Sequence, residues 1–377
     1  MLAPLFDVSA GAWLLLATGV AVAVQCLGIP RRAGAAWRSV AWAVTGVSVG
    51  LFAVVWGTNE LSDMQGWQSQ DELTAERIYV PPGLDEAPVW LFVGSSFTRA
   101  GIDPERVNSR LAEAGLDVRI MVRGAGGASR LEQWGFIKDA IAVLGRPPEA
   151  VFLEVAAPYD TLPAYGLRNP MSGRAISQFD VQGGLWLAEA LLAAPEEAAL
   201  RGLEAPMSVA GDTIAHVLVN TLNVGLLHRL ADLDTVTPRS PFVPRAEPKE
   251  DYDPVAQAKA LAPRPWEIGT GPLAGPAPNP WIKSWLNDVE TNLRELGVER
   301  FGFYVLPHAA VSLRRYARSF CDGQSAEGYV CLNGNTRPLL DRLDVGHWID
   351  STHLRAPGAA VFSDWLADRL IAAEASR

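Results

Sequence analysis

Two adjacent serines follow an apolar run near residue 90, at a position where an α/β protein can hold a nucleophile. The run Val89–Val93 is followed by Gly94, Ser95 and Ser96. A short apolar run bounded by Pro88 and a glycine is typical of a parallel strand covered on both faces. Because α/β folds hold their chemistry at the carboxyl ends of such strands, a hydroxyl there is a candidate nucleophile. The alternative is a Gly-Ser turn without chemistry, since short motifs often arise by chance.

A candidate base and its carboxylate partner lie near the other end of the chain, in the segment Asp350-Ser351-Thr352-His353. A serine nucleophile needs a base that accepts its proton and a carboxylate that fixes the tautomer of that base. Asp350 and His353 are three residues apart and can share one side of a helical turn. One of the two serines, His353 and Asp350 are therefore candidates for nucleophile, base and orienting group.

A glycine-rich turn, Arg123-Gly124-Ala125-Gly126-Gly127-Ala128, follows a second predicted strand over residues 117–122. A backbone N–H in such a turn can point at the negative oxygen that develops during acyl transfer. Gly126 and Gly127 are both candidates for this donor, alongside the N–H of Ser96. The structural alternative is a tight strand-to-helix turn that requires a positive φ. The pattern lacks the full spacing of a dinucleotide-binding motif.

These three blocks resemble the SGNH/GDSL hydrolase superfamily, with Ser95 in place of the aspartate that usually precedes the nucleophile. This variant resembles the membrane-anchored DltD-like members and the alginate O-acetylation proteins of the AlgX/AlgJ type. The resemblance covers about residues 88–160 and 298–372. It implies an α/β fold, a flavodoxin-like SGNH three-layer sandwich with a parallel sheet. It also assigns Ser96 as nucleophile, His353 as base and Asp350 as its orienter.

The third block departs from the family pattern. After the predicted strand 150–155, family members carry Gly-x-Asn-Asp, whose asparagine donates to the oxyanion. This chain has Ala156-Ala157-Pro158-Tyr159-Asp160 instead. Losing one oxyanion donor typically costs about 10²–10³ in rate, so the departure argues against fast hydrolysis more than against transfer to a held acceptor. Glu154 is either a substrate-binding or supporting group, or a buried carboxylate bonded to nearby backbone N–H groups.

Four further residues flank these blocks and are candidates for substrate binding: Arg99, Tyr159, His347 and Trp348. His347-x-x-Asp350-x-x-His353 could alternatively bind a metal ion, since imidazole and carboxylate ligands suit zinc. We expect no metal and no cofactor, because no further ligand is evident and the serine interpretation accounts for more residues. His308 is either a pocket residue at a strand end or an ordinary loop histidine.

The first 57 residues predict two transmembrane helices, about 10–29 and 39–57. Each stretch is uncharged and about as long as a bilayer-spanning helix. The arginines between them, at positions 31, 32 and 38, place the connection in the cytoplasm by the positive-inside rule. Everything after residue 57 is then periplasmic or extracellular. A cleaved signal peptide is a weaker alternative, because the chain does not start with a basic segment.

Cys321 and Cys331 predict a disulfide in a loop that precedes the turn Asn333-Gly334. Oxidising compartments permit such a bond, and this agrees with a domain outside the cytoplasm. The alternative is two unpaired thiols.

The 377-residue chain can hold one large α/β domain plus additional segments. Its net charge of −10 and the lack of a basic stripe argue against a nucleic-acid partner. We expect a membrane-proximal linker over 58–87 and a catalytic domain over 88–377, interrupted at about 161–280 by a helical insertion. Residues 238–280 read as a loop rich in proline and glycine. Strands and helices alternate on both sides of the insertion, which predicts the parallel sheet. The predicted helices are 104–114, 129–145, 280–296, 309–320 and 356–373, and a further strand is 301–306.

The resemblance implies a membrane-anchored serine acyltransferase that O-acetylates an envelope or secreted polysaccharide through an acyl-serine intermediate. Such proteins often work beside a membrane-bound O-acyltransferase, which is therefore an expected partner. One alternative is an extracytoplasmic esterase that removes acyl groups from the same polymers. Another is a non-catalytic scaffold or binding partner that retains the fold.

Overall fold

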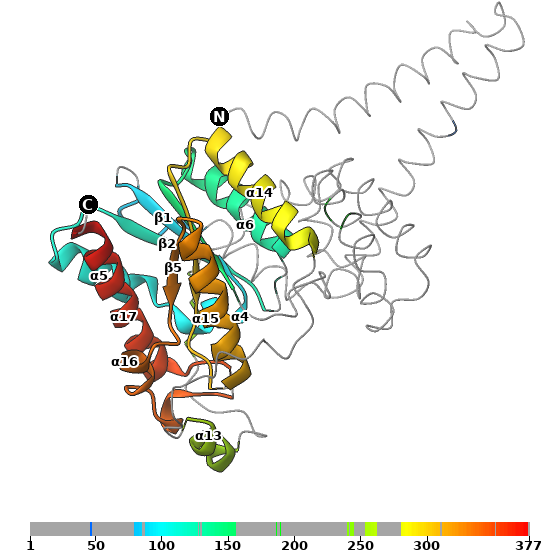
Figure 1. Ribbon diagram of the computed structural model, residues 1–377. Helices are drawn as coiled ribbons and strands as arrows, with labels where there is room; N and C mark the ends of the chain where they lie inside the picture. Colours follow the sequence, from blue (N-terminus) through cyan, green and yellow to red (C-terminus); the bar gives the residue numbers. More distant parts are fainter. Residues whose placement is uncertain are drawn as a thin grey trace, which may run out of the picture. The chain divides into compact units, whose positions relative to one another are not determined.

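The computed structural model describes one α/β unit and a few residues elsewhere (Figure 1). The chain forms two compact units, one of Met1–Thr74, Gly166–Ala188 and Pro195–Thr237, the other of Ala75–Tyr165, Glu189–Ala194 and Pro238–Arg377. The predicted membrane helices, most of the linker and most of the insertion lie outside the described residues. Among the residues that are described, no helix combines the length and apolar character needed to cross a membrane. The described residues are 46, 79–84, 87–126, 128, 130–155, 186, 189, 240, 242–244, 253–261, 280–309, 311–350 and 352–375.

A five-stranded sheet organises the second unit, and each pair of neighbouring strands is parallel. The strand order is β2-β1-β3-β4-β5, which is the order found in flavodoxin-like doubly wound folds. The predicted α/β class with a parallel sheet is thus confirmed for the described residues. The strands are β1 (Val89–Gly94), β2 (Arg119–Gly124), β3 (Ala150–Glu154), β4 (Arg300–Val305) and β5 (Val330–Asn333).

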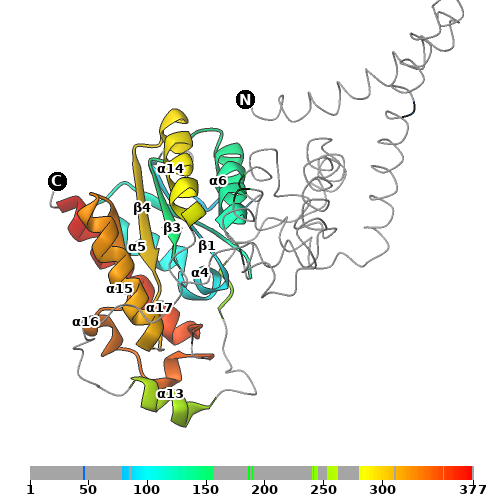
Figure 2. The ribbon, with the colours of Figure 1, turned by 45° about the vertical axis from the view of Figure 1, so that its right-hand side comes forward.

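Helices cover both faces of the sheet. Alternate residues of the interior strand β1, such as Trp90 and Phe92, pack in a core with helices α5 (Pro104–Glu113) and α17 (Ala356–Ala375). The opposite face is covered by α6 (Arg130–Leu144), α14 (Pro280–Glu295) and α15 (Val311–Ala326). Figures 1 and 2 show α6 beside α14. Burial on both faces explains why β1 is an uninterrupted apolar run.

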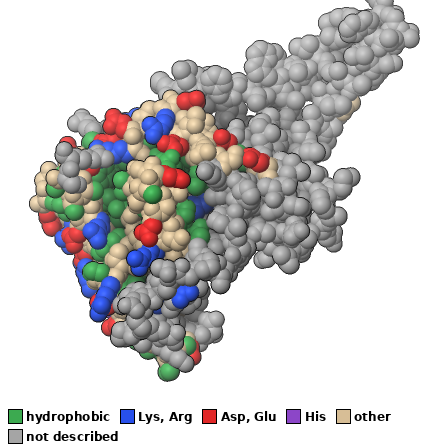
Figure 3. All heavy atoms as spheres, in the orientation of Figure 1, with side chains coloured by type: hydrophobic (Ala, Val, Ile, Leu, Met, Phe, Trp, Pro, Cys, Tyr) green, Lys and Arg blue, Asp and Glu red, His purple; other side chains and the backbone are tan. Residues whose placement is uncertain are grey.

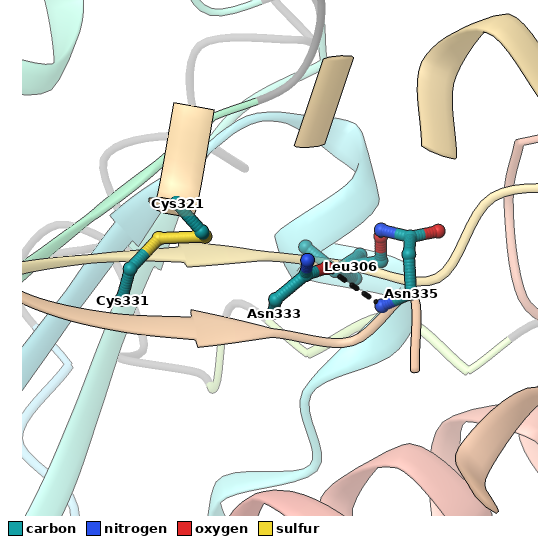
Figure 4. The surroundings of a disulfide bond; sticks show 5 residues. All are labelled: Leu306, Cys321, Cys331, Asn333 and Asn335. Carbon is teal, nitrogen blue, oxygen red and sulfur yellow. Dashed lines mark hydrogen bonds between the residues drawn. A yellow bond between two sulfur atoms is a disulfide. The ribbon is translucent and has the colours of Figure 1, made fainter. Parts of the chain in front are cut away.

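The edge of the sheet differs from the sequence expectation, which placed both cysteines in a loop. Cys321 lies in α15 and Cys331 lies in the edge strand β5, and the two form a disulfide with a Cα–Cα distance of 5.3 Å (Figure 4). The strand was not predicted because it has four residues and only Leu332 among them is buried, so its sequence carries no apolar run. The helix continues past Phe320 to Ala326 despite an internal glycine.

Three short helices were also not predicted. Helix α13 (Pro254–Leu261) forms inside the segment expected to be a loop, where Asp253 accepts hydrogen bonds from the N–H groups of Val255 and Ala256. Helix α4 (Ser96–Gly101) follows β1 directly. Helix α16 (Arg337–Leu340) and the 3₁₀ turn η2 (Val345–His347) precede the last helix. Elements of three to eight residues are too short to show a helical hydrophobic period.

The predicted start of α5 is observed. Asp103 accepts a hydrogen bond from the N–H of Arg106, and Pro104 occupies the first turn. The guanidinium of Arg106 also pairs with Asp364 of α17 at 2.7 Å, which joins the two helices on the first face. On the surface seen in Figure 3, acidic and basic side chains are interspersed rather than grouped by sign.

Candidate active site

Ser96 lies beyond the carboxyl end of β1, an interior strand that pairs with β2 on one side and β3 on the other. The strand ends at Gly94, and Ser95 is the N-cap of α4, with its side chain accepting a hydrogen bond from the N–H of Phe97. Ser96 is therefore the first residue of a short helix, and it is half-buried. This is the strand-end position that the sequence predicted for a nucleophile.

The base approaches from the other end of the chain. Ser96 Oγ lies 2.8 Å from His353 Nε2, across a sequence separation of 257 residues. His353 Nδ1 lies 2.9 Å from Asp350 Oδ2 and 3.0 Å from Oδ1. The carboxylate fixes the proton on Nδ1, so Nε2 is free to accept the serine proton. The three predicted residues have the spacing that a nucleophile, a base and an orienting group require.

Asp350 and His353 do not share a helical turn, in contrast to the sequence expectation. Asp350 Oδ1 accepts hydrogen bonds from the N–H groups of Thr352 and His353, both at 2.8 Å, and from the Thr352 hydroxyl at 2.9 Å. An aspartate that binds the backbone two and three residues ahead forms a compact Asx-type turn. The turn is closed by an antiparallel bridge between Trp348 and Leu354. The loop, not a helix, sets the Asp–His geometry.

A second Asp-x-x-His pair lies just before the first. His347 Nδ1 is 2.7 Å from Asp344 Oδ1, and this hydrogen bond holds the pKa of Asp344 below its ordinary value. The pair caps η2, and the Asp344 side chain is 75 % exposed. Each histidine thus has its own carboxylate. Within the described ranges, no group of three or more His, Cys, Asp or Glu side chains is arranged to hold a metal ion.

Glu154 lies under the Ser96 turn and is 1 % exposed. Its carboxylate accepts hydrogen bonds from the N–H and the hydroxyl of Ser95 and from the N–H and the hydroxyl of Thr98. This corresponds to the second alternative of the sequence analysis, a buried carboxylate on backbone N–H groups. In this conformation Glu154 is covered and cannot contact a substrate.

Tyr304 extends this polar cluster from β4. Its hydroxyl lies 2.6 Å from Thr98 Oγ1, which itself donates to Glu154. Burial, together with the negative charge of Glu154, raises the pKa of Tyr304 well above its usual value. The tyrosine therefore stays protonated, and its hydroxyl donates a hydrogen bond to Thr98 Oγ1. The order of donation runs from Tyr304 through Thr98 to Glu154.

Gly94 is required because this cluster touches its Cα. A Cβ at this position would lie 2.0 Å from Thr98 Oγ1, 2.2 Å from Glu154 Oε2 and 2.7 Å from Tyr304 Oη. Gly124, its partner on β2, faces the backbone of the same turn, where a Cβ would be 2.9 Å from the Gly94 carbonyl oxygen. The glycine that ends β1 therefore marks close packing of polar side chains.

The predicted oxyanion donors are the N–H groups of Ser96 and of Gly126 or Gly127, and the Ser96 N–H is considered first. It has no hydrogen-bond partner within the part of the chain that the structure describes, so it is available to a substrate oxygen. Gly126 is exposed, with nothing within 4 Å of a Cβ built on it, and its φ is not positive. The positive φ expected in this turn is not found at Gly124 or Gly126. Gly127 lies outside the described residues.

The remaining substrate-binding candidates have different positions. Arg99 is half-buried in α4, and its carbonyl accepts a hydrogen bond from the N–H of Val243 at 2.9 Å. Trp348 is fully buried in the core on the α17 face, so its side chain does not reach a substrate in this conformation. His347 is engaged with Asp344. Tyr159 lies outside the described residues.

His308 is a residue of the site that the sequence analysis left between two interpretations. It follows β4 and is 1 % exposed, and neither ring nitrogen has a hydrogen-bond partner among the described residues. The ring of Phe97 packs against both imidazoles, 5.7 Å from His308 and 4.6 Å from His353. Burial, and to a smaller extent the charges of His353 and Arg314, lowers the pKa of His308 to about 4. His308 is therefore a buried neutral imidazole beside the candidate base.

Comparisons with known proteins add no family. The chain matches no protein-family model and shows no significant similarity to a curated protein. The fold and the site define a class of arrangement: a parallel α/β unit with a Ser–His–Asp constellation at the carboxyl end of the interior strand β1. The family resemblance stays a prediction from the sequence.

Proposed function

We propose that this chain is a membrane-anchored, SGNH-like serine acyltransferase that O-acetylates an envelope or secreted polysaccharide. The observation that carries the proposal is the contact of Ser96 Oγ with His353 Nε2 at 2.8 Å, with Asp350 bound to the other ring nitrogen. A serine hydroxyl is a weak nucleophile until a base is placed in this way. Two segments remote in sequence place a hydroxyl on an imidazole nitrogen, which favours chemistry over a simple turn.

The reaction has two symmetrical halves. Ser96 Oγ attacks the acyl carbonyl carbon while its proton moves to His353 Nε2, and Asp350 stabilises the imidazolium. The bond to the leaving group then breaks, and His353 returns the proton to that group. An acceptor hydroxyl next loses its proton to His353 and attacks the acyl-serine. Release of Ser96 restores the enzyme, and the Ser96 N–H stabilises the oxyanion in both halves.

The missing asparagine of the third block favours transfer over hydrolysis. With fewer oxyanion donors, reaction with unpositioned water slows, while a bound acceptor regains rate through its held position. The acyl group is acetyl or similar, and the acceptor is a polysaccharide hydroxyl. An esterase acting on the same polymers would use the same first half and differ only in accepting water.

The proposed location is outside the cytoplasm, on a two-helix membrane anchor with a membrane-bound O-acyltransferase as partner. The bond between Cys321 and Cys331 supports an oxidising compartment. The strand order supports the finer fold, the SGNH three-layer sandwich that follows the anchor and carries the 161–280 insertion. The uncharged stretches at 10–29 and 39–57 support the anchor.

The test is to trap the acyl-serine. Full-length protein in detergent is incubated with p-nitrophenyl acetate, quenched in acid and digested for mass spectrometry. We expect acetyl on the peptide that contains Ser96, and none in Ser96→Ala. Ser109→Ala is the matched control, because Ser109 is an exposed serine of α5 that bonds only to Glu113 on the same helix; its labelling should equal that of the parent.

The second arm separates transfer from hydrolysis and from a scaffold role. A chitosan or alginate oligosaccharide is added, and acetylated sugar and free acetate are measured. Acetylated sugar that depends on Ser96 supports transfer, whereas free acetate that does not fall with added acceptor indicates an esterase. If the parent and Ser96→Ala are equally inert and Ser96→Ala still supports polymer acetylation in cells, the enzymatic proposal is wrong.

A further inference from the structure

We propose that Glu154 is a positioning residue that fixes the nucleophile turn and leaves the Ser96 N–H as its unoccupied donor. The inference rests on the proposed function and concerns how that site is held. Glu154 ends β3 and lies beside Tyr304 of β4 in the register of the sheet. It is 1 % exposed, so its carboxylate acts within the protein.

Glu154 binds groups on both sides of Ser96. Oε2 accepts from the Ser95 N–H at 2.8 Å, from the Thr98 N–H at 3.2 Å and from the Thr98 hydroxyl. Oε1 accepts from the Ser95 hydroxyl at 2.6 Å. One carboxylate therefore binds the residue before the nucleophile and the residue two positions after it. Ser96 is held from both sides by a group attached to the neighbouring strand.

The N–H groups of the turn differ in whether they have an acceptor. The Ser95 and Thr98 N–H groups bind Glu154, and the Phe97 N–H binds the Ser95 hydroxyl. Within the described residues, the Ser96 N–H has no such acceptor. Glu154 and the Ser95 side chain thus occupy the N–H groups of Ser95, Phe97 and Thr98. Among the described residues, they leave the Ser96 N–H without an acceptor. An oxyanion donor must be oriented before the reaction, and this arrangement does so.

The donors around Glu154 require a carboxylate at this position. Four donors converge on Glu154, and a carboxylate has about four acceptor sites and no donor. Glutamine would place its NH₂ group either against the Ser95 hydroxyl, where one bond is lost, or against the Ser95 N–H and the two Thr98 donors, where three are lost. The anchor of α4 would then loosen at Thr98 or at Ser95. Displacements of about 1 Å can cost about 10²-fold in rate.

The test combines amide exchange with kinetics on full-length protein. In Glu154→Gln we expect the peptide spanning residues 94–101 to exchange its amide hydrogens at least about tenfold faster, while peptides from α17 keep the parent rate. Ester turnover with p-nitrophenyl acetate should lose about 10²-fold in kcat, with KM within about twofold. The kinetic pKa of the base should not move, because His353 and Asp350 are untouched.

Two further variants keep the test decisive. Thr98→Val removes one donor but leaves the carboxylate, and it serves as the test variant if Glu154→Gln folds poorly. We expect faster exchange in residues 94–101 and a lower kcat, both by smaller factors than in Glu154→Gln. Glu149→Gln is the matched control, because Glu149 is a half-buried carboxylate at the start of the same strand, paired with Arg300 at 3.0 Å. Its kcat should stay within about twofold of the parent.

The outcomes separate this inference from the function on which it rests. Unchanged exchange in residues 94–101 of Glu154→Gln overturns the inference, whatever the activity. Faster exchange with parent kcat also overturns it, because the residue would then be only structural. An inert parent protein refutes the proposed function, and the exchange result still decides whether Glu154 holds the turn.

Discussion

The two halves of the candidate site are built in different ways. The nucleophile half is part of the sheet: β1, Gly94 and the turn at Ser95–Ser96 rest on a buried carboxylate from β3. The base half is a surface loop between η2 and α17, where the side chains of His353 and Asp350 are 16 % and 20 % exposed. The first half is held by long-range contacts and the second by hydrogen bonds within four residues.

This difference assigns different costs to mutations in the two halves. Changes in the nucleophile half disturb a close-packed core, so they should reduce stability and activity together. Changes in the base half disturb a local turn, so they should reduce activity with little loss of stability. The following predictions test that division, from the largest expected effect to the smallest.

The largest effect is expected for Asp350→Asn, in the base half. An asparagine cannot hold the proton of His353 on Nδ1 in the same way, and kcat should fall by about 10⁴-fold. The melting temperature should change little, because the turn keeps an acceptor at this position. Ester turnover and differential scanning calorimetry measure the two quantities.

Asp344→Asn is the matched control for that prediction, because Asp344 holds His347 at the same spacing without contacting Ser96. Its kcat should stay within about twofold of the parent. Equal losses in the two variants would contradict the assignment of His353 as the base.

Gly94→Ala is expected to have the largest effect on stability. Its Cβ would overlap Thr98, Glu154 and Tyr304, and overpacking at such a site costs about 3 kcal/mol or more. Urea unfolding should show this loss together with lower activity. Gly323→Ala serves as control, since it lies in α15 with nothing within 4 Å of a Cβ and should be neutral or stabilising. Parent stability in Gly94→Ala would show that the cluster is not closely packed.

His308 predicts an acid-dependent stability. Its pKa is lowered from 6.5 to about 4, so between these pH values the unfolded chain binds a proton that the folded chain does not. Stability should therefore fall as the pH decreases from about 6.5 to about 4, by up to about 3 kcal/mol in total. Urea unfolding at several pH values measures this slope.

The variant His308→Phe removes the titrating group while keeping a ring against Phe97. The part of the slope that belongs to His308 should disappear in this variant. An unchanged slope would mean that other groups cause the acid sensitivity and that His308 is not held neutral by burial.

The smallest effect is expected for Thr352→Val, in the base half. The substitution removes the hydroxyl that donates to Asp350 at 2.9 Å and keeps the backbone bond. We expect about 1 kcal/mol lower stability and less than a tenfold loss in kcat. Thr291→Val, on the exposed side of α14, controls for the change of residue type. A loss as large as that of Asp350→Asn would indicate a direct role of Thr352.

The sequence alone determined the parts of this protein that depend on local pattern. The apolar run ending at Gly94-Ser95-Ser96 predicted a buried strand with a serine at its end, and the helix predicted over 104–114 has the same first residue as α5. The spacing of Cys321 and Cys331 suggested a disulfide. Each of these signals lies within about ten residues, so it can be recognised from neighbouring residue types without knowing which distant segments pack nearby.

Only the tertiary structure decided how remote residues meet. The role of Glu154 depends on β3 lying beside β1, and the requirement for Gly94 depends on Thr98 and Tyr304 reaching the same point. The burial of His308 depends on Phe97 from another segment. A residue's own sequence neighbours carry no record of such contacts, because the free energy that fixes them comes from packing between strands and helices far apart in the chain.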